Sequence, residues 1–70
     1  MNYIKRIRDL REDADYTQEF VAQYLGIKRQ MYRRYEIGET ELPSRHVISL
    51  SKLYKVSTDY IFGLDNHKTK

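Results

Sequence analysis

The chain has 70 residues, no cysteine and a formal net charge of +3, with a pI near 9.3. This length allows one small domain, which buries only about 60% of the surface that its unfolded chain exposes. Without cysteine there is no disulfide framework and no thiolate metal site, so stability has to come from compact helix packing, association or both.

The sequence contains neither a signal-peptide pattern nor a membrane span. Its start, MNYIKRIRDLRED, alternates charged and apolar residues and lacks an uninterrupted apolar region. No stretch approaches the roughly 18 apolar residues of a membrane span. We therefore expect a soluble cytoplasmic protein, and its basic character favours an acidic partner.

A first helix is predicted over about residues 2–13. Apolar side chains recur there at i, i+4, i+7 and i+11, which is the spacing of one helix face. These residues are Tyr3, Ile7, Leu10 and Ala14. Asp15 then interrupts the pattern.

A second helix is predicted from Thr17 to about Tyr24. Thr17 is a good N-cap, and Tyr16 and Val21 have the spacing of a hydrophobic staple. We expect Gly26 to end this helix, because a left-handed C-terminal turn favours a residue without Cβ.

A third helix is predicted from Lys28 to about Glu36. Ile27 and Tyr32 have the staple spacing around Lys28, and Gly38 is expected to end the helix.

A fourth helix is predicted to begin at Pro43–Ser44, after the loop ETELP. Its apolar side is formed by Val47, Leu50, Leu53 and Tyr54. Ser57 is expected to cap a short fifth helix, with Val56 and Ile61 as its staple and Gly63 at its end.

These elements predict a compact all-α domain of five helices over residues 1–64. The last six residues, DNHKTK, have nothing to bury and are expected to form a flexible, disordered tail over 65–70. Since the sequence has no further domain signature, we expect a single domain, which is either a complete small protein or one domain of a longer protein.

The second and third predicted helices have the spacing of a helix-turn-helix, with a short turn GIK that contains glycine. At about 100° per residue, Met31, Tyr32 and Tyr35 share one side of the third helix. The opposite side, which we call the cationic face, carries Arg29, Gln30, Arg33 and Arg34. The third helix should therefore dock with its tyrosines and present the cationic face to solvent.

The cationic face has side chains suited to nucleic acid. Arg can bond bidentately to guanine O6 and N7, Gln to adenine N6 and N7, and either can bind a phosphate oxygen. A basic helix face is often simply solvated, but here no acidic residue interrupts the run from Lys28 to Arg34. We therefore expect this helix to contact nucleic acid in the major groove.

The stretch TQEFVAQYLGIKRQMYRRYEIGE, followed by LP and VSTDYIFG, resembles the Cro/phage-repressor (Xre-like) helix-turn-helix family over about residues 4–64. The positions that match are Thr17, Gln18, Ala22, Gly26, Tyr35, Glu36, Gly38 and Pro43. The resemblance implies a five-helix, lambda-repressor-like domain with its third helix in the major groove. It also implies a transcriptional regulator, a repressor, that binds a palindromic DNA operator as a homodimer at the nucleoid.

The resemblance implies roles for individual residues. Gln18 matches a position that contacts a phosphate and supports the recognition residues. Positions that reach base edges or flanking phosphates are matched by Lys28, Arg29, Gln30 and Arg34. Arg33 is expected to contact the DNA backbone, while Arg11 and Glu36 match a structural ion pair between the first and third helices.

The sequence also departs from the family pattern. Lys28 replaces the usual Ser or Thr, so an N-cap worth about 1 kcal/mol is lost while a charge that attracts phosphate is gained. Glu39 and Glu41 stand in the loop where basic or polar residues would help to bind the DNA backbone, and should lower nonspecific affinity. Arg45 is a partial replacement for such a loop contact.

A dimer contact is expected in the region of the fifth helix, over residues 58–64. Its apolar residues exceed what one short helix can bury: Tyr60, Ile61, Phe62 and Leu64. A two-fold dimer would place two recognition helices about 34 Å apart in successive major grooves.

The alternative hypothesis is a protein-interaction module, such as an antitoxin or adaptor. It would use Phe20, Tyr24 and the surface of the fifth helix. Phe20 and Tyr24 lie one turn apart, and we expect them to cover the edge of the core rather than to bind a partner. An adaptor has no need for an uninterrupted cationic face, so DNA binding is favoured.

An enzyme is not expected. His46 lies three residues before Ser49, but no acidic orienting residue or oxyanion-hole pattern accompanies the pair. Two histidines without cysteine give no metal-ligand spacing, and no cofactor or effector motif is apparent.

Overall fold

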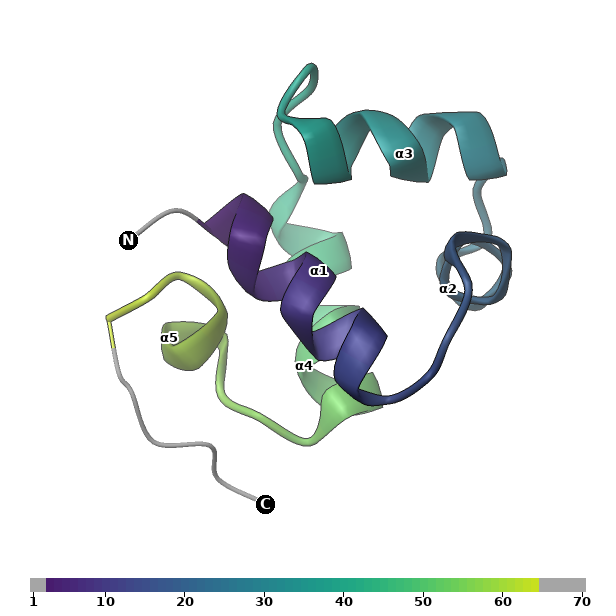
Figure 1. Cartoon of the computed structure of the whole chain (residues 1–70). Helices are drawn as coiled ribbons and strands as arrows, with labels where there is room; N and C mark the ends of the chain where they lie inside the picture. Colours follow the sequence, from purple (N-terminus) through teal and green to yellow (C-terminus); the bar gives the residue numbers. More distant parts are fainter. Residues whose placement is uncertain (1–2, 65–70) are drawn as a thin grey trace.

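The computed structural model describes residues 3–64, and within this range all regular secondary structure is helical (Figure 1). The five helices are α1 (Tyr3–Asp13), α2 (Gln18–Leu25), α3 (Arg29–Ile37), α4 (Ser44–Tyr54) and α5 (Thr58–Ile61). The predicted all-α fold is confirmed, and the helices begin and end close to the predicted residues. The predicted disorder of residues 65–70 lies outside the described residues.

The helix ends follow the predicted capping chemistry. Thr17 Oγ1 accepts a hydrogen bond from the Phe20 amide at 3.0 Å at the start of α2. Gly26 and Gly38 end α2 and α3 in the left-handed region, with φ values of 76° and 83°. A Cβ at Gly38 would also lie 2.8 Å from Ile4 Cδ1, but this is the far end of a flexible side chain that can shift, so the left-handed φ is the stronger constraint.

The core is formed by apolar side chains from every helix. Its members are Ile7, Leu10, Val21, Ala22, Tyr32, Tyr35, Leu42, Val47, Leu50, Val56 and Ile61. The prediction for Ala14 is wrong, since this residue is exposed. The physical reason is that α1 ends at Asp13 and the chain turns at Asp15, which has a left-handed φ of 60°, so Ala14 lies in the turn after the helix and is open to solvent.

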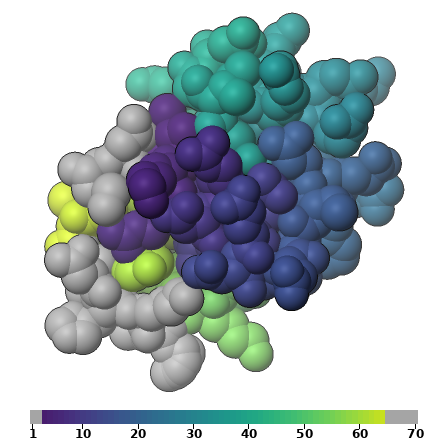
Figure 2. Space-filling model, in the orientation of Figure 1, coloured from purple at the N-terminus to yellow at the C-terminus, as the bar shows by residue number. Residues whose placement is uncertain are grey.

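α1 connects the two halves of the domain. It packs against α3 on one side and α5 on the other, while α2 packs on α3 and α4 on α5 (Figure 1). In the space-filling view, the blue-to-teal segment that holds α2 and α3 forms the right and upper edge of the molecule (Figure 2). The helix-turn-helix thus forms one side of the domain, away from α5. Within the described residues, none of the helices is long and apolar enough to cross a membrane.

Candidate nucleic-acid interface

α3 has the two distinct sides that its sequence predicts. Tyr32 and Tyr35 are buried in the core, and Met31 is half-buried. All four residues of the cationic face are exposed: Arg29, Gln30, Arg33 and Arg34. The tyrosines therefore anchor the helix, and the cationic face is open to a partner.

The start of α3 is free of a side-chain cap. Lys28 occupies the N-cap position with extended backbone angles, φ −77° and ψ 151°, and its side chain makes no capping hydrogen bond. Lys28 is exposed, so its charge adds to the positive end of the helix dipole. Both features favour a negatively charged group at this end of α3.

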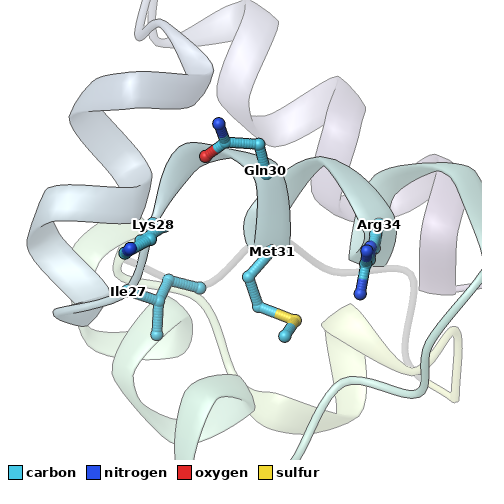
Figure 3. A pocket seen from close by; sticks show the side chains of 5 residues that line it. All are labelled: Ile27, Lys28, Gln30, Met31 and Arg34. Carbon is cyan, nitrogen blue, oxygen red and sulfur yellow. The ribbon is translucent and has the colours of Figure 1, made fainter.

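A shallow pocket of about 440 Å³ runs along α3 beside the cationic face (Figure 3). It is lined by Ile27, Lys28, Gln30, Met31 and Arg34. Figure 3 shows Met31 between Ile27 and Arg34, so apolar side chains lie next to hydrogen-bond donors. This combination suits the edge of a base pair, where hydrogen-bonding atoms lie beside the thymine methyl group.

Behind this surface, the Glu36 carboxylate accepts hydrogen bonds from three helices. Arg11 donates from Nε to Oε2 at 2.7 Å and from Nη2 to Oε1 at 3.1 Å. Gln18 Nε2 donates to Oε1 at 3.0 Å, and the Tyr32 hydroxyl donates to Oε2 at 2.5 Å. Arg11 Nη1 also donates to the carbonyl oxygen of Tyr16 at 3.0 Å. The ion pair between Arg11 and Glu36 is therefore the centre of a larger network.

This network keeps Glu36 ionised in the core. Burial alone would raise the pKa of the carboxyl group, but hydrogen bonds from Arg11, Tyr32 and Gln18 outweigh that effect, and the pKa of Glu36 is lowered. The hydrogen bond between Arg11 and Glu36 in turn raises the pKa of the Arg11 guanidinium. Burial, followed by the bond to Glu36, raises the pKa of the Tyr32 hydroxyl, which stays protonated as a donor.

Two further predicted DNA-binding residues, Gln18 and Arg45, lie outside α3. Gln18 is the first residue of α2 and is half-buried, with one amide N–H committed to Glu36. Gln18 therefore connects the hydrogen-bond network around Glu36 to the surface of the domain at the start of α2. Arg45 is exposed in the first turn of α4, after the loop that carries Glu39 and Glu41, and it makes no ion pair among residues 3–64.

The structure does not combine His46 and Ser49 into a catalytic pair. His46 is buried against Tyr35, with ring centroids 5.9 Å apart, and burial lowers the pKa of its imidazole. Ser49 Oγ donates instead to the carbonyl oxygen of Arg45 at 3.1 Å. Among the described residues there is also no group of three acidic or histidine side chains that could hold a metal ion.

The expected dimer contact needs one correction. Ile61 is 0% exposed and belongs to the chain's own core, so its assignment to an interface is wrong. The staple spacing after the Ser57 cap directs Ile61 inward. Tyr60 is half-buried, with the Arg6 guanidinium 4.0 Å from its ring centroid. Phe62 and Leu64 remain exposed, Leu64 at 77%.

Phe20 and Tyr24 are tied to the core edge but only partly covered. The Phe20 ring packs on Tyr16 with centroids 4.4 Å apart, and the Tyr24 hydroxyl donates to the carbonyl oxygen of Ser49 at 3.1 Å. Each of the two side chains is nevertheless 44% exposed.

Sequence reasoning missed several contacts around the interface. The bond from Tyr32 to Glu36 could have been found from its i,i+4 spacing, which brings side chains together on a helix. The contact between Gln18 and Glu36 has no local signal, because it depends on how α2 packs against α3. An ion pair between Arg34 and Glu39 was missed as well, with Nε and Oε1 3.7 Å apart.

Comparison with known proteins supports the same architecture. A family model described as helix-turn-helix matches residues 7–61. Relatives from Bacillus subtilis (strain 168) include the HTH-type transcriptional regulator ImmR, 36% identical over 100% of this chain and 55% of its own. The uncharacterized HTH-type transcriptional regulator YobD is 39% identical over 89% of this chain and 55% of its own. The chain therefore spans about half the length of these relatives.

A solved structure shows the fold independently. The P22 c2 repressor protein, in complex with synthetic operator 9T, superimposes with a TM-score of 0.81 at 26% identity. The match covers 93% of this chain and 98% of the repressor chain. Together with the helix-turn-helix geometry of α2 and α3, these similarities show that the chain belongs to the Cro/C1-type helix-turn-helix family of DNA-binding regulators.

Proposed function

We propose that this chain is a sequence-specific DNA-binding transcriptional regulator, a repressor that occupies an operator with α3 in the major groove. The observation that carries the proposal is the exposed cationic face on the second helix of a helix-turn-helix. The buried Tyr32 and Tyr35 hold this helix against the core, so the face is presented on a rigid element. The similarity to a repressor solved on an operator supports the same orientation.

The proposal gives the exposed side chains different roles. Arg29, Gln30 and Arg34 contact base edges, where a bidentate Arg recognises guanine and a bidentate Gln recognises adenine. Lys28 and Arg33 contact phosphates, together with the free N–H of Gln18. The pocket beside Met31 receives the apolar part of a base pair. Arg45 adds a backbone contact from α4, and the protein acts in the cytoplasm at the nucleoid.

The protein is proposed to bind as a homodimer. One recognition helix covers too few base pairs for operator specificity, whereas a two-fold dimer places two helices about 34 Å apart. Phe62 and Leu64 are exposed apolar residues beyond the end of α5 and supply the contact. The operator is then an inverted repeat.

Selection of preferred sites from random duplex DNA tests the proposal. We expect an inverted repeat whose half-sites are centred about one helical turn apart. Binding should weaken with salt, with log K falling by about 0.9 per log unit of salt for each phosphate contact. If no sequence is enriched and binding is insensitive to salt, the proposal is wrong.

A second candidate function is supported by the exposure of Phe20 and Tyr24, each 44% exposed on α2. In that case the domain is an interaction module, and these rings bind a protein partner. Phe20→Ser and Tyr24→Ser should then abolish partner binding while leaving DNA binding intact. If the selected operator is bound with steep salt dependence, DNA binding is the primary function.

A further inference from the structure

The loop after α3 returns beside the helix end. Gly38, with φ at 83°, donates its amide to the carbonyl oxygen of Tyr35 at 3.3 Å, and the Glu39 amide donates to the carbonyl oxygen of Arg34 at 2.9 Å. This pair of hydrogen bonds is a Schellman motif. It fixes the backbone of Glu39 next to that of Arg34.

The side chains of these two residues also form an ion pair. Arg34 Nε lies 3.7 Å from Glu39 Oε1, and the side chains are 54% and 61% exposed. Arg34 lines the same pocket as Lys28 and Gln30, so the carboxylate acts on a residue of the proposed base-contacting surface. Within residues 3–64, neither Arg29 nor Arg33 forms an ion pair.

We propose that Glu39 is a specificity-determining residue, which positions Arg34 for a base contact and opposes its capture by phosphate. This inference rests on the proposed function. A carboxylate on the Nε side of a guanidinium leaves both terminal nitrogens free for the bidentate contact with guanine O6 and N7. The negative charge of Glu39 also repels the DNA backbone, which is the competing partner of Arg34.

Glu41 provides a matched control for the loss of charge. It lies two residues further along the same loop, is exposed, and forms no ion pair among the described residues. Glu39→Gln and Glu41→Gln therefore remove the same charge from the same loop, but only Glu39→Gln removes the partner of Arg34. Both positions are exposed, so the core should be unaffected, and circular dichroism checks folding.

The experiment compares three duplexes: the selected operator, an unrelated sequence, and the operator changed at the base pair whose preference Arg34→Ala abolishes. Both Gln variants should bind the unrelated duplex more tightly than the wild type, and Glu39→Gln should do so more strongly, because it also releases Arg34 to bind phosphate. Only Glu39→Gln should reduce discrimination at the Arg34 base pair, by about two- to fivefold, the range that an exposed ion pair can contribute.

Two further results would distinguish positioning from a general charge effect. In an Arg34→Ala background, Glu39→Gln and Glu41→Gln should raise affinity for the unrelated duplex equally, since the interacting partner of Glu39 is absent. In the protein that retains Arg34, the loss of discrimination caused by Glu39→Gln should become smaller as the salt concentration rises, because salt screens the ion pair between Arg34 and Glu39.

The inference is wrong if Glu39→Gln and Glu41→Gln discriminate equally between the operator and the duplex changed at the Arg34 base pair. It is also wrong if Arg34→Ala leaves the preferred sequence unchanged. In both cases the proposed function stands as long as the wild type still prefers the selected operator. If the wild type has no preferred duplex, the proposed function fails together with the inference.

Discussion

The Glu36 carboxylate lies in the core, where an unpaired charge would strongly destabilise the fold. Its partners Arg11, Gln18 and Tyr32 come from three different helices. A buried ion pair adds little net stability compared with apolar residues of similar volume, but removing one partner leaves the other charge unpaired. The packing of α1, α2 and α3 therefore depends on each of these side chains.

Removing one partner of the ion pair between Arg11 and Glu36 should destabilise the fold more than removing one partner of an exposed ion pair. For Arg11→Met or Glu36→Gln we expect the free energy of unfolding to fall by more than the roughly 0–1 kcal/mol of an exposed pair, and towards about 3–5 kcal/mol. The double variant should lose less than the sum of the single variants. Urea unfolding measures all three, and additive losses would mean that the two residues do not interact.

The lowered pKa of Glu36 predicts an acid-sensitive fold. Since its folded-state pKa lies below the usual value of 4.5, the ionised carboxylate contributes its full stabilisation above pH 4.5, and this is lost as the pH falls through the folded-state pKa. Below pH 4.5, the free energy of unfolding should fall more steeply with acid for the wild type than for Glu36→Gln. Equal slopes in denaturant titrations at several pH values would contradict this.

Two neighbouring arginines of the cationic face are predicted to differ in role. Arg34→Ala should lower affinity for the operator by about 1–3 kcal/mol and relax the preference at one symmetric pair of positions. Arg33→Ala should weaken binding to all sequences and reduce the salt slope by about one. Gln30→Ala should act like Arg34→Ala, but less strongly.

Binding curves on matched and mismatched duplexes at several salt concentrations provide the measurement, with folding checked by circular dichroism. If folded Arg29→Ala, Gln30→Ala and Arg34→Ala variants all kept wild-type affinity and preference, α3 would not be the recognition helix. The interaction module would then be the better explanation.

At the scale of the element, α3 is packed firmly against the core, but its N-terminus has no side-chain cap. Tyr32 and Tyr35 bury one side of the helix, and Gly38 ends it in the left-handed conformation. Its N-terminus has no side-chain cap, in contrast to α2, where Thr17 accepts a bond from the Phe20 amide. The residue responsible, Lys28, has instead a charge suited to a phosphate.

Replacing Lys28 with serine should make the fold more stable and DNA binding weaker. Its extended backbone suits an N-cap, so Lys28→Ser should raise the free energy of unfolding by about 1 kcal/mol. Affinity for all DNA sequences should fall, and the salt slope should decrease by about one. Thr17→Ala, which removes the cap of α2, is the control for the size of a capping effect. Unchanged DNA affinity in Lys28→Ser would exclude a phosphate contact by Lys28.

For the whole molecule, α1 determines how the two ends of the domain are related. It packs against α3 and α5 (Figure 1), and the Arg6 guanidinium covers the Tyr60 ring at 4.0 Å. The Tyr3 ring also meets Phe62 edge-on, with centroids 6.1 Å apart. Since α1 links both ends, the proposed dimer contact near α5 has a defined orientation relative to the cationic face.

The dimer is predicted to form on the inverted repeat through Phe62 and Leu64. Phe62→Ser and Leu64→Ser should reduce affinity for the complete operator more than affinity for an isolated half-site, because they remove the contact between protomers. Ile48→Ser, at another exposed apolar residue, serves as the control and should change neither the affinity for the complete operator nor the affinity for the half-site. Mass measurement of the complex should give two chains per operator, and one chain at saturation would contradict the dimer.

The sequence by itself determined the five helices, most of their ends and the two sides of α3. These features depend on interactions between residues a few positions apart, such as the Thr17 cap and the glycines at 26 and 38. Local signals were insufficient at the end of α1, where no glycine marks the stop, and for that reason the prediction for Ala14 was wrong.

Only the tertiary structure decided which side chains complete the interior. Glu36 binds Gln18 because α2 packs across α3, and Arg6 lies over Tyr60 because α1 packs on α5. The staple spacing directs Ile61 inward, but its complete burial depends on the packing of α1 and α4 against α5. A periodic pattern identifies an apolar residue, but burial depends on the area that distant elements can cover, which is fixed only when the helices pack together.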